Sequence, residues 1–286
     1  MTMHRAWLAA LAVLAATSAA PTLAACLSDA EVAALLAAYE AKTPAVTPEG
    51  LNAADGECTR GKLNKLLEAR LGKPVGYKAG LTNPAVQKRF GADAPVWGTL
   101  YANMLLANGA VVDAAFGARP LFEADMLVRI SDEAVNRAKT ADDVLRAIDQ
   151  VIPFIELPDL VVQAPPKLNG AGITAINVGA RLGVMGAPVP VQRTAEFGNA
   201  LRDMVVVVKG DGNELDRGKG SDILEHPLNA VVWLVQDMAR EGKALKKGDL
   251  VSLGSFSKLM PPKPGLAVEI SYEGLPGNPK VNVSFK

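Results

Sequence analysis

The sequence predicts an α+β fold, in which a small helical part over residues 26–74 precedes a β-rich domain over residues 75–286. Strand-like and helix-like segments do not alternate regularly, which argues against a doubly wound parallel sheet. The C-terminal third of the chain is mainly strand-like. With 286 residues, 49% of them apolar, the chain is long enough to form a large core.

Residues 1–25 have the features of a signal peptide. Arg5 precedes an unbroken apolar run over Trp7–Ala16, and small residues follow before Cys26. This run is shorter than the ~20 residues of a membrane-spanning helix, and no later stretch is long and apolar enough to span a bilayer. We therefore expect an exported, periplasmic protein.

Two fates are open for Cys26. Leu23 to Cys26 resembles the lipobox of bacterial lipoproteins, which would place a lipid on Cys26. Alternatively, Cys26 pairs with Cys58, and two cysteines in an exported chain favour this disulfide. A capping box of Ser28 and Glu31 also starts a helix at once, where a lipoprotein usually has a flexible tether.

Periodicity and cap residues predict the elements of the N-terminal half. Gly72 and Pro74 end the second helix, and Pro84 lies in the first turn of the third. A loop with Pro and Gly is expected over Thr43–Gly56. The helices are expected over Asp29–Ala41, Arg60–Leu71 and Thr82–Phe90, and the strands over Val75–Leu81, Thr99–Leu106 and Ala110–Asp113.

The remaining elements follow from the same signals. Thr140 caps a helix, Asp211-Gly212 predicts a hairpin turn, and Pro227 and Gly242 bound a helix. The glycine-rich stretch Gly170–Gly186 is expected to form strands or closely packed backbone. The helices are expected over Ala141–Val151 and Pro227–Arg240, and the strands over Leu121–Ile130, Ile152–Leu157, Met204–Lys209, Glu214–Asp216, Asp249–Leu253, Leu266–Tyr272 and Lys280–Phe285.

Three carboxylates interrupt two apolar strands. Glu123 and Asp125 are two residues apart in a strand, so they project from the same face. Glu156 occupies a similar place in Ile152–Leu157. Buried carboxylates repel one another and need a proton, a basic partner or a cation. They therefore predict a site for Mg²⁺ or Mn²⁺, and the alternative is a wet face on an edge strand.

Lys78 is a further candidate, because it lies between Gly76 and Gly80. Glycines let a backbone approach a ligand closely, and a lysine there can bind a substrate carboxylate or transfer a proton. The alternative is an ordinary turn lysine.

Composition excludes several classes of function. The 30 basic residues balance the 30 acidic ones, which excludes a strongly basic nucleic-acid binder. Without His4 of the leader, two cysteines and one histidine remain, which are too few for a Cys/His zinc finger. Only His226 remains outside the leader, at a helix start, so a Ser-His-Asp triad is not expected.

From Leu63 onward the chain resembles the 2-keto-4-pentenoate hydratase branch of the fumarylacetoacetate hydrolase superfamily. The motifs that carry the resemblance are Gly76-Tyr-Lys-Ala-Gly-Leu-Thr82, Arg119-Pro120 with Glu123-x-Asp125, Ile152-Pro-x-Ile-Glu156, Gly218-x-Gly-Ser221 and His226-Pro-Leu-Asn-Ala-x-x-Trp-Leu234.

The resemblance implies a mixed β-roll, homo-oligomers and a catalytic domain over residues 75–286. It also implies that Glu123, Asp125 and Glu156 bind Mg²⁺ or Mn²⁺ and that Lys78 binds the substrate carboxylate or assists proton transfer. The implied reaction adds water to a small 2-hydroxydienoic or 2-oxo acid, giving a 4-hydroxy-2-oxo acid.

The motifs also depart from the family pattern. Asp125 stands where the family has Glu, and Val96, Ile176 and Leu253 replace polar residues; Leu157–Val161 lacks the Ser-Arg that commonly follows the third ligand. The metal half of the site is kept, whereas the water-handling half is altered. Two alternatives therefore stand beside hydration: decarboxylation of a 2-oxo-diacid, and a non-catalytic periplasmic homologue that binds an oxo acid.

Overall fold

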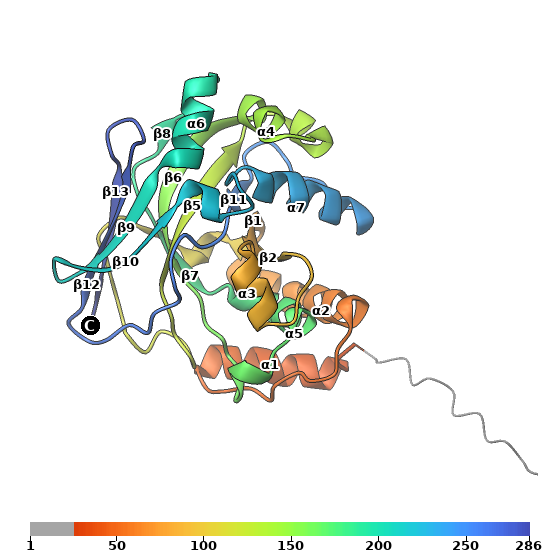
Figure 1. Ribbon diagram of the computed structural model, residues 1–286. Coiled ribbons are helices and arrows are strands. Elements are labelled where there is room, and N and C mark those ends of the chain that lie inside the picture. Colours follow the sequence, from red (N-terminus) through yellow and green to blue (C-terminus); the bar gives the residue numbers. More distant parts are fainter. Residues whose placement is uncertain (1–25) are drawn as a thin grey trace, which may run out of the picture.

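The computed structural model describes residues 26–286, in which two curled sheets form a roll and the helices lie mainly around the larger sheet (Figure 1). This confirms the predicted mixed α+β class. The signal peptide predicted over residues 1–25 lies outside the described residues. Within residues 26–286, no helix has the length and apolar character needed to cross a membrane.

The larger sheet has eight strands in the order β2-β1-β11-β5-β6-β7-β3, with β8 paired to β6. The central strand β5 pairs antiparallel with β11 on one side and with β6 on the other. The strands are β1 (Pro74–Gly80), β2 (Val96–Tyr101), β3 (Leu105–Ala107), β5 (Glu123–Ile130), β6 (Ile148–Leu157), β7 (Leu182–Met185), β8 (Val189–Pro190) and β11 (Leu250–Ser252).

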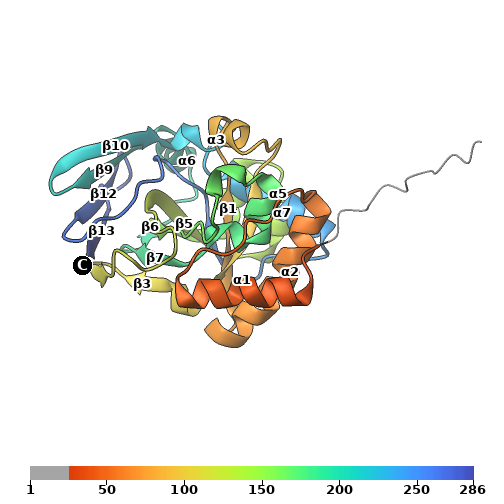
Figure 2. The same cartoon turned by 90° about the horizontal axis from the view of Figure 1, so that it is seen from below.

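The second sheet has five strands in the order β10-β9-β12-β13-β4 and lies beside the first (Figures 1 and 2). The short segment from β3 to β4 passes from one sheet to the other. The strands are β4 (Ala110–Val112), β9 (Val205–Gly210), β10 (Asn213–Lys219), β12 (Ala267–Glu273) and β13 (Lys280–Phe285).

Seven α-helices are described in residues 26–286. They are α1 (Asp29–Ala41), α2 (Ala53–Leu71), α3 (Pro84–Arg89), α4 (Ala141–Ala147), α5 (Gly170–Ala175), α6 (Ala195–Asp203) and α7 (Asn229–Arg240). Figure 2 shows α1 and α2 on one side of the roll, away from the second sheet.

Two hydrophobic cores lie on opposite faces of the eight-stranded sheet. One contains Ala124, Met126 and Val128 of β5 together with the second sheet, α4, α6 and α7. The other contains Leu127 of β5 together with α1, α2 and α5. Because alternate residues of a strand face opposite sides, β5 contributes apolar side chains to both cores.

The structure corrects several predicted boundaries. The second helix starts at Ala53 and not at Arg60, because Asn52 and Asp55 form a capping box within the predicted loop. The helix predicted to reach Val151 ends at Ala147, because Ile148 already pairs with β5. Gly170–Ala175 forms α5 rather than a strand, and the sequence analysis missed α6.

Cys26 and Cys58 form a disulfide with a Cα–Cα distance of 5.7 Å. This confirms the expected pairing, and the bond uses the thiol that a lipid anchor on Cys26 would need. It joins the start of the described chain to α2. Ser28 and Glu31 make the predicted capping box at the start of α1.

Candidate active site

Four strands of the eight-stranded sheet end at one edge and bring polar side chains together. In the sheet, Lys78 of β1 lies opposite Ser252 of β11, and Glu123 of β5 lies opposite Glu156 of β6. Directly paired residues project from the same face, and Asp125 follows Glu123 on that face. All five residues are buried. The wet face of an edge strand is therefore not what the structure shows.

Lys78 and Glu156 form a buried ion pair, with side chains only 4% and 3% exposed. The Lys78 ammonium donates to Glu156 Oε1 and to the Val178 carbonyl oxygen, the latter at 2.9 Å. Lysine has three N–H donors, so one remains for a ligand. Lys78 is therefore not an ordinary turn lysine.

A strained turn places the Val178 carbonyl within hydrogen-bond distance of the Lys78 ammonium. Asn177 and Val178 both have φ of 54°, which is rare for a β-branched residue and costs backbone strain. The Asn177 side chain holds this turn on β2: its Oδ1 accepts from the Thr99 N–H at 2.7 Å, and its Nδ2 donates to the Thr99 carbonyl at 2.9 Å.

The glycines beside Lys78 meet protein and not a ligand. A Cβ on Gly76 would lie 2.0 Å from the Leu250 carbonyl oxygen, so only glycine lets β1 approach β11 here. A Cβ on Gly80 would lie 2.5 Å from Val178 Cγ1. The expected close approach of backbone is present, and its role is to seat the strand that carries Lys78.

Asp125 is held by donors from β11 and its own strand. Its Oδ1 accepts from the N–H groups of Met126, Leu253 and Gly254, at 2.5, 3.1 and 3.1 Å. The Ser252 hydroxyl bonds to Oδ2 at 2.5 Å. The carboxylate is thus turned toward the end of β11, and Asp125 does not line the pocket that Glu123 and Glu156 line.

Burial and neighbouring charges make the ionised form of Glu123 unfavourable. Burial raises the pKa of Glu123 well above its usual range, and the nearby Glu156 carboxylate raises it further, whereas Lys78 opposes the shift. Burial and then Glu156 also raise the pKa of Asp125. Fully ionised, three carboxylates beside one ammonium leave two excess negative charges in a buried site.

The structure brings together Glu123, Glu156 and Lys78 but not the full predicted ligand set. In residues 26–286, no three His, Cys, Asp or Glu side chains converge as a metal site. The two glutamates nevertheless suit a hard divalent cation, because they offer only oxygen ligands and the site has excess negative charge. The role of Asp125 as a third ligand stays a prediction.

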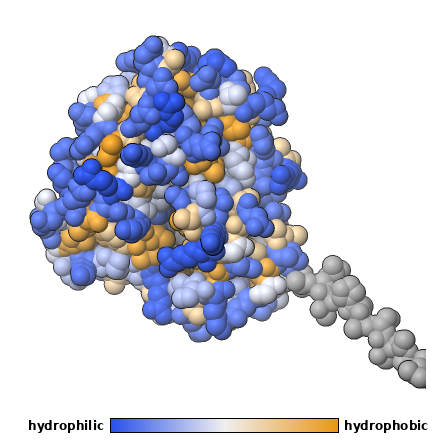
Figure 3. All heavy atoms as spheres, viewed as in Figure 1, coloured by the Kyte–Doolittle hydropathy of each residue, from blue (hydrophilic) through white to orange (hydrophobic). Residues whose placement is uncertain are grey.

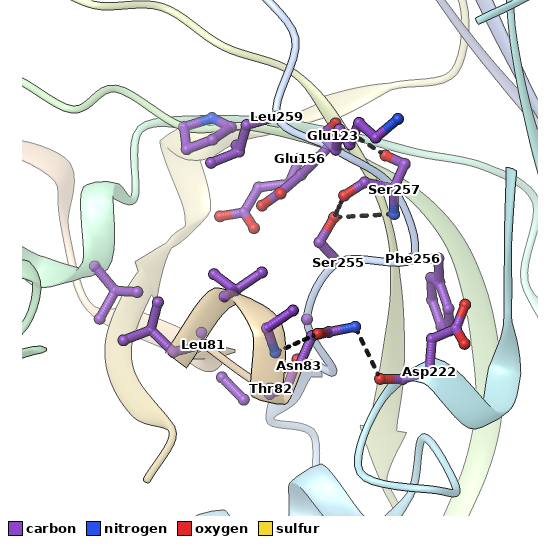
Figure 4. Close-up of a pocket in the computed structure, with 18 of the residues that line it drawn as sticks. Leu81, Thr82, Asn83, Glu123, Glu156, Asp222, Ser255, Phe256, Ser257 and Leu259 are labelled. Atoms are coloured by element: carbon purple, nitrogen blue, oxygen red, sulfur yellow. Dashed lines mark hydrogen bonds between the residues drawn. The ribbon is translucent and has the colours of Figure 1, made fainter. Parts of the chain in front are cut away.

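Glu123 and Glu156 line a pocket of about 550 Å³. Figure 4 shows these two side chains together on one side of the cavity, with Asn83 and Asp222 on the opposite side. Ser255 lies between them and donates to the Ser257 carbonyl at 2.6 Å. The pocket thus has its buried charged group at one end and further polar side chains across the cavity.

His226 does not take part in this site. Its Nδ1 accepts from the Leu228 N–H at 3.1 Å, and its Nε2 lies 3.0 Å from the Gly198 carbonyl oxygen. Burial lowers its pKa. These contacts hold the ring against the chain outside the pocket, and no histidine of residues 26–286 lines the pocket.

The residues that line the site were predicted from the sequence, whereas the residues that hold them in position were not. Ser252 and the amides of Leu253 and Gly254 are far from Asp125 in the chain, and only the pairing of β11 with β5 brings them together. Asn177 carried a weak signal, as part of a motif in which its neighbour Ile176 departs from the family pattern.

Comparison with known proteins identifies relatives of two activities. The chain is 31% identical over 202 residues to 2-keto-4-pentenoate hydratase 2 of Dechloromonas aromatica (strain RCB), covering 70% of this chain and 75% of the relative. It is 27% identical over 222 residues to 4-oxalocrotonate decarboxylase of Pseudomonas putida, covering 78% and 82%. No family model matches the chain.

Solved structures share the fold. The 4-oxalocrotonate decarboxylase of Pseudomonas putida G7, complexed with magnesium and adipate, superposes with a TM-score of 0.79 at 24% identity, over 92% of this chain and all of that one. A fumarylacetoacetate hydrolase family protein from yeast gives a TM-score of 0.53 at 15% identity, over 73% and 91%. The predicted fold family is therefore confirmed.

Proposed function

The chain belongs to the 2-keto-4-pentenoate hydratase family, and from that premise we propose that it is a divalent-metal-dependent lyase that hydrates a small 2-hydroxydienoic or 2-oxo acid. The proposed product is a 4-hydroxy-2-oxo acid. The observation that carries the proposal is the buried group of Lys78, Glu123 and Glu156 at the end of a pocket.

Each of these side chains has a distinct proposed task. Lys78 has one N–H donor free beside its bonds to Glu156 and Val178, and this donor suits the substrate carboxylate or a proton transfer. Glu123 and Glu156 would hold the cation, Mg²⁺ or Mn²⁺. When bound, that ion supplies positive charge for the oxygen at C2 of the substrate.

The position of Lys78 supports this assignment. Its ammonium is fixed by a carboxylate and a carbonyl, so it needs no reorganisation when an anionic ligand arrives. A near-neutral chain has no broad positive field, so capture of an acid depends on such local charges. Water then adds across the conjugated double bond of the substrate.

The test is the ultraviolet absorbance of a short 2-hydroxydienoate. The absorbance should fall after addition of the protein with Mg²⁺, and Lys78→Met should slow the fall by at least a hundredfold. The control is Lys167→Met, whose side chain is exposed and pairs with Glu49 outside the pocket. No decay with any short dienoate would refute hydration.

Decarboxylation of a 2-oxo-diacid is the second candidate, because proteins named 4-oxalocrotonate decarboxylase are found among both the sequence relatives and the fold neighbours. Release of carbon dioxide from such a diacid, without hydration, would favour it. Binding of an oxo acid with no turnover would favour the non-catalytic alternative, which the apolar replacements motivate.

We also propose export to the periplasm. The leader at residues 1–25 and the Cys26–Cys58 disulfide support it, because disulfides persist in oxidising compartments. Mass spectrometry of the mature protein tests cleavage, and a diacylglycerol on Cys26 would refute the disulfide. Light scattering tests the homo-oligomer that the family implies.

A further inference from the structure

The pocket extends beyond Glu123 and Glu156, and apolar side chains form much of its wall. These walls come from α3, α5 and the loops around the strand ends, and they include Leu81, Val86, Phe90, Leu160, Ile173 and Leu259. Leu81 and Leu259 lie along the cavity in Figure 4. A ligand held at Glu123 and Glu156 therefore contacts apolar side chains as well as the polar residues Asn83 and Asp222 across the cavity.

The size of the pocket exceeds the needs of a five-carbon acid. Its volume of about 550 Å³ falls within the range of roughly 300–1,000 Å³ typical of sites for much larger organic ligands. Burying apolar surface against such walls adds affinity, whereas a short acid would leave them in contact with water.

Val86 points to the same conclusion. The surface in Figure 3 is mainly hydrophilic with small apolar groups, and few large apolar side chains are strongly exposed in residues 26–286. Val86 is one of them, with 36% of its surface exposed, and it lines the pocket on α3. A ligand that fills the pocket would cover it.

Charges in the pocket lining are mixed, so no cluster of unpaired cations marks a place for a second carboxylate on the ligand. Arg217 is bound by Glu214 at 2.5 and 2.6 Å, and Lys258 lies 3.8 Å from Asp216. Arg89 makes no ion pair with residues 26–286 and lies over the Phe90 ring at 5.7 Å. Asp216 and Asp222 also line the pocket and would repel a distal anion.

We propose that the substrate is a 2-oxo or 2-hydroxydienoic acid with an apolar substituent, aryl or branched alkyl, at the end remote from its carboxylate. This rests on the proposed function, because Lys78, Glu123 and Glu156 orient the acid end. The apolar wall containing Val86 and Ile173 contacts the substituent.

Calorimetry of the full mature protein with Mg²⁺ tests the proposal with three saturated 2-oxo acids. We expect 2-oxo-5-phenylpentanoate to bind at least tenfold more tightly than 2-oxopentanoate, and 2-oxohexanedioate to bind no more tightly than 2-oxopentanoate. Equal affinity of the phenyl and short acids, or tightest binding of the diacid, would overturn the inference alone. Failure of all three to bind would overturn the proposed function with it.

A matched pair of variants locates the contact. Val86→Ser should weaken binding of the phenyl acid at least threefold and leave 2-oxopentanoate unchanged. Val111→Ser is the control, because Val111 is 64% exposed on β4 and does not line this pocket. An equal effect of Val86→Ser on both acids, or no effect on the phenyl acid, would contradict the proposed wall.

Discussion

Replacing Glu123 by Gln should stabilise the metal-free protein at pH 8. Glu123 is 9% exposed and lies directly opposite Glu156 in the sheet. Two unit charges about 5 Å apart repel by roughly 3 kcal/mol at an effective dielectric constant of 20. Lys78 offsets part of this repulsion, so we expect Glu123→Gln to raise the free energy of unfolding by about 1–3 kcal/mol.

The effect should depend on pH with a defined sign. Because the pKa of Glu123 is raised in the folded protein, folding takes up a proton above the usual pKa of the unfolded carboxyl. Stability is then greatest below that unfolded pKa, and it falls as pH rises toward the raised folded pKa. The advantage of Glu123→Gln should therefore grow from about pH 4, near the ordinary glutamate pKa, to pH 8.

The assay is urea denaturation in EDTA with the disulfide intact, at several values of pH. The control is Glu133→Gln, because Glu133 is exposed and lies outside the pocket. A lower stability of Glu123→Gln at pH 8, or an advantage that does not change with pH, would refute the reasoning about excess negative charge.

Mg²⁺ should reverse the order of the two proteins. A ligand at a hundred times its dissociation constant stabilises the folded state by about 2.7 kcal/mol. We expect an increase of this size for the wild type and almost none for Glu123→Gln. An equal increase for both would show that Glu123 does not hold the ion.

Three further predictions use the same unfolding assay. Lys78→Met should cost about 3–5 kcal/mol because it leaves the buried Glu156 without its partner, and adding Glu156→Gln should restore most of the loss; a loss without such rescue would contradict the ion-pair account. Removing the disulfide with Cys26→Ser and Cys58→Ser should lower the free energy of unfolding by about 3–4 kcal/mol for a sequence separation of 32. The reduced wild type should unfold at the same urea midpoint as this double variant. A midpoint of the double variant equal to that of the oxidised wild type would contradict the bond. Asp125→Asn should lower the free energy of unfolding by about 2 kcal/mol because several donors lose a charged acceptor. The variant should still be stabilised by Mg²⁺. Loss of this stabilisation would show that Asp125 is a metal ligand after all.

The sequence was most informative where the chemistry lies on a single strand. The spacing of Glu123 and Asp125 in an apolar segment predicted that both project from one face of a strand, and β5 bears this out. The spacing alone could not show that Glu123 lines the pocket and that Asp125 does not. Asp125 is held by β11, and the pairing of β11 with β5 is a long-range contact that no local pattern encodes.

Local signals also failed where tertiary packing decides the structure. The stretch from Gly170 suggested strands, but Asn169 caps the short helix α5, accepting from the Gly172 N–H. The turn at Asn177 and Val178 has positive φ at both residues, and a β-branched residue such as Val178 rarely adopts it, so the sequence did not predict this turn. That turn provides the Val178 carbonyl as an acceptor for Lys78, which the sequence marked by its flanking glycines and by the family resemblance.

The most direct test of the account is product analysis by nuclear magnetic resonance, with a short 2-hydroxydienoate, the mature protein and Mg²⁺. The account predicts a 4-hydroxy-2-oxo acid, formed by the wild type with Mg²⁺ and strongly reduced by EDTA or by Lys78→Met. An unchanged dienoate with every short substrate, or equal conversion by Lys78→Met, would contradict the assignment of this pocket as the active site of a lyase.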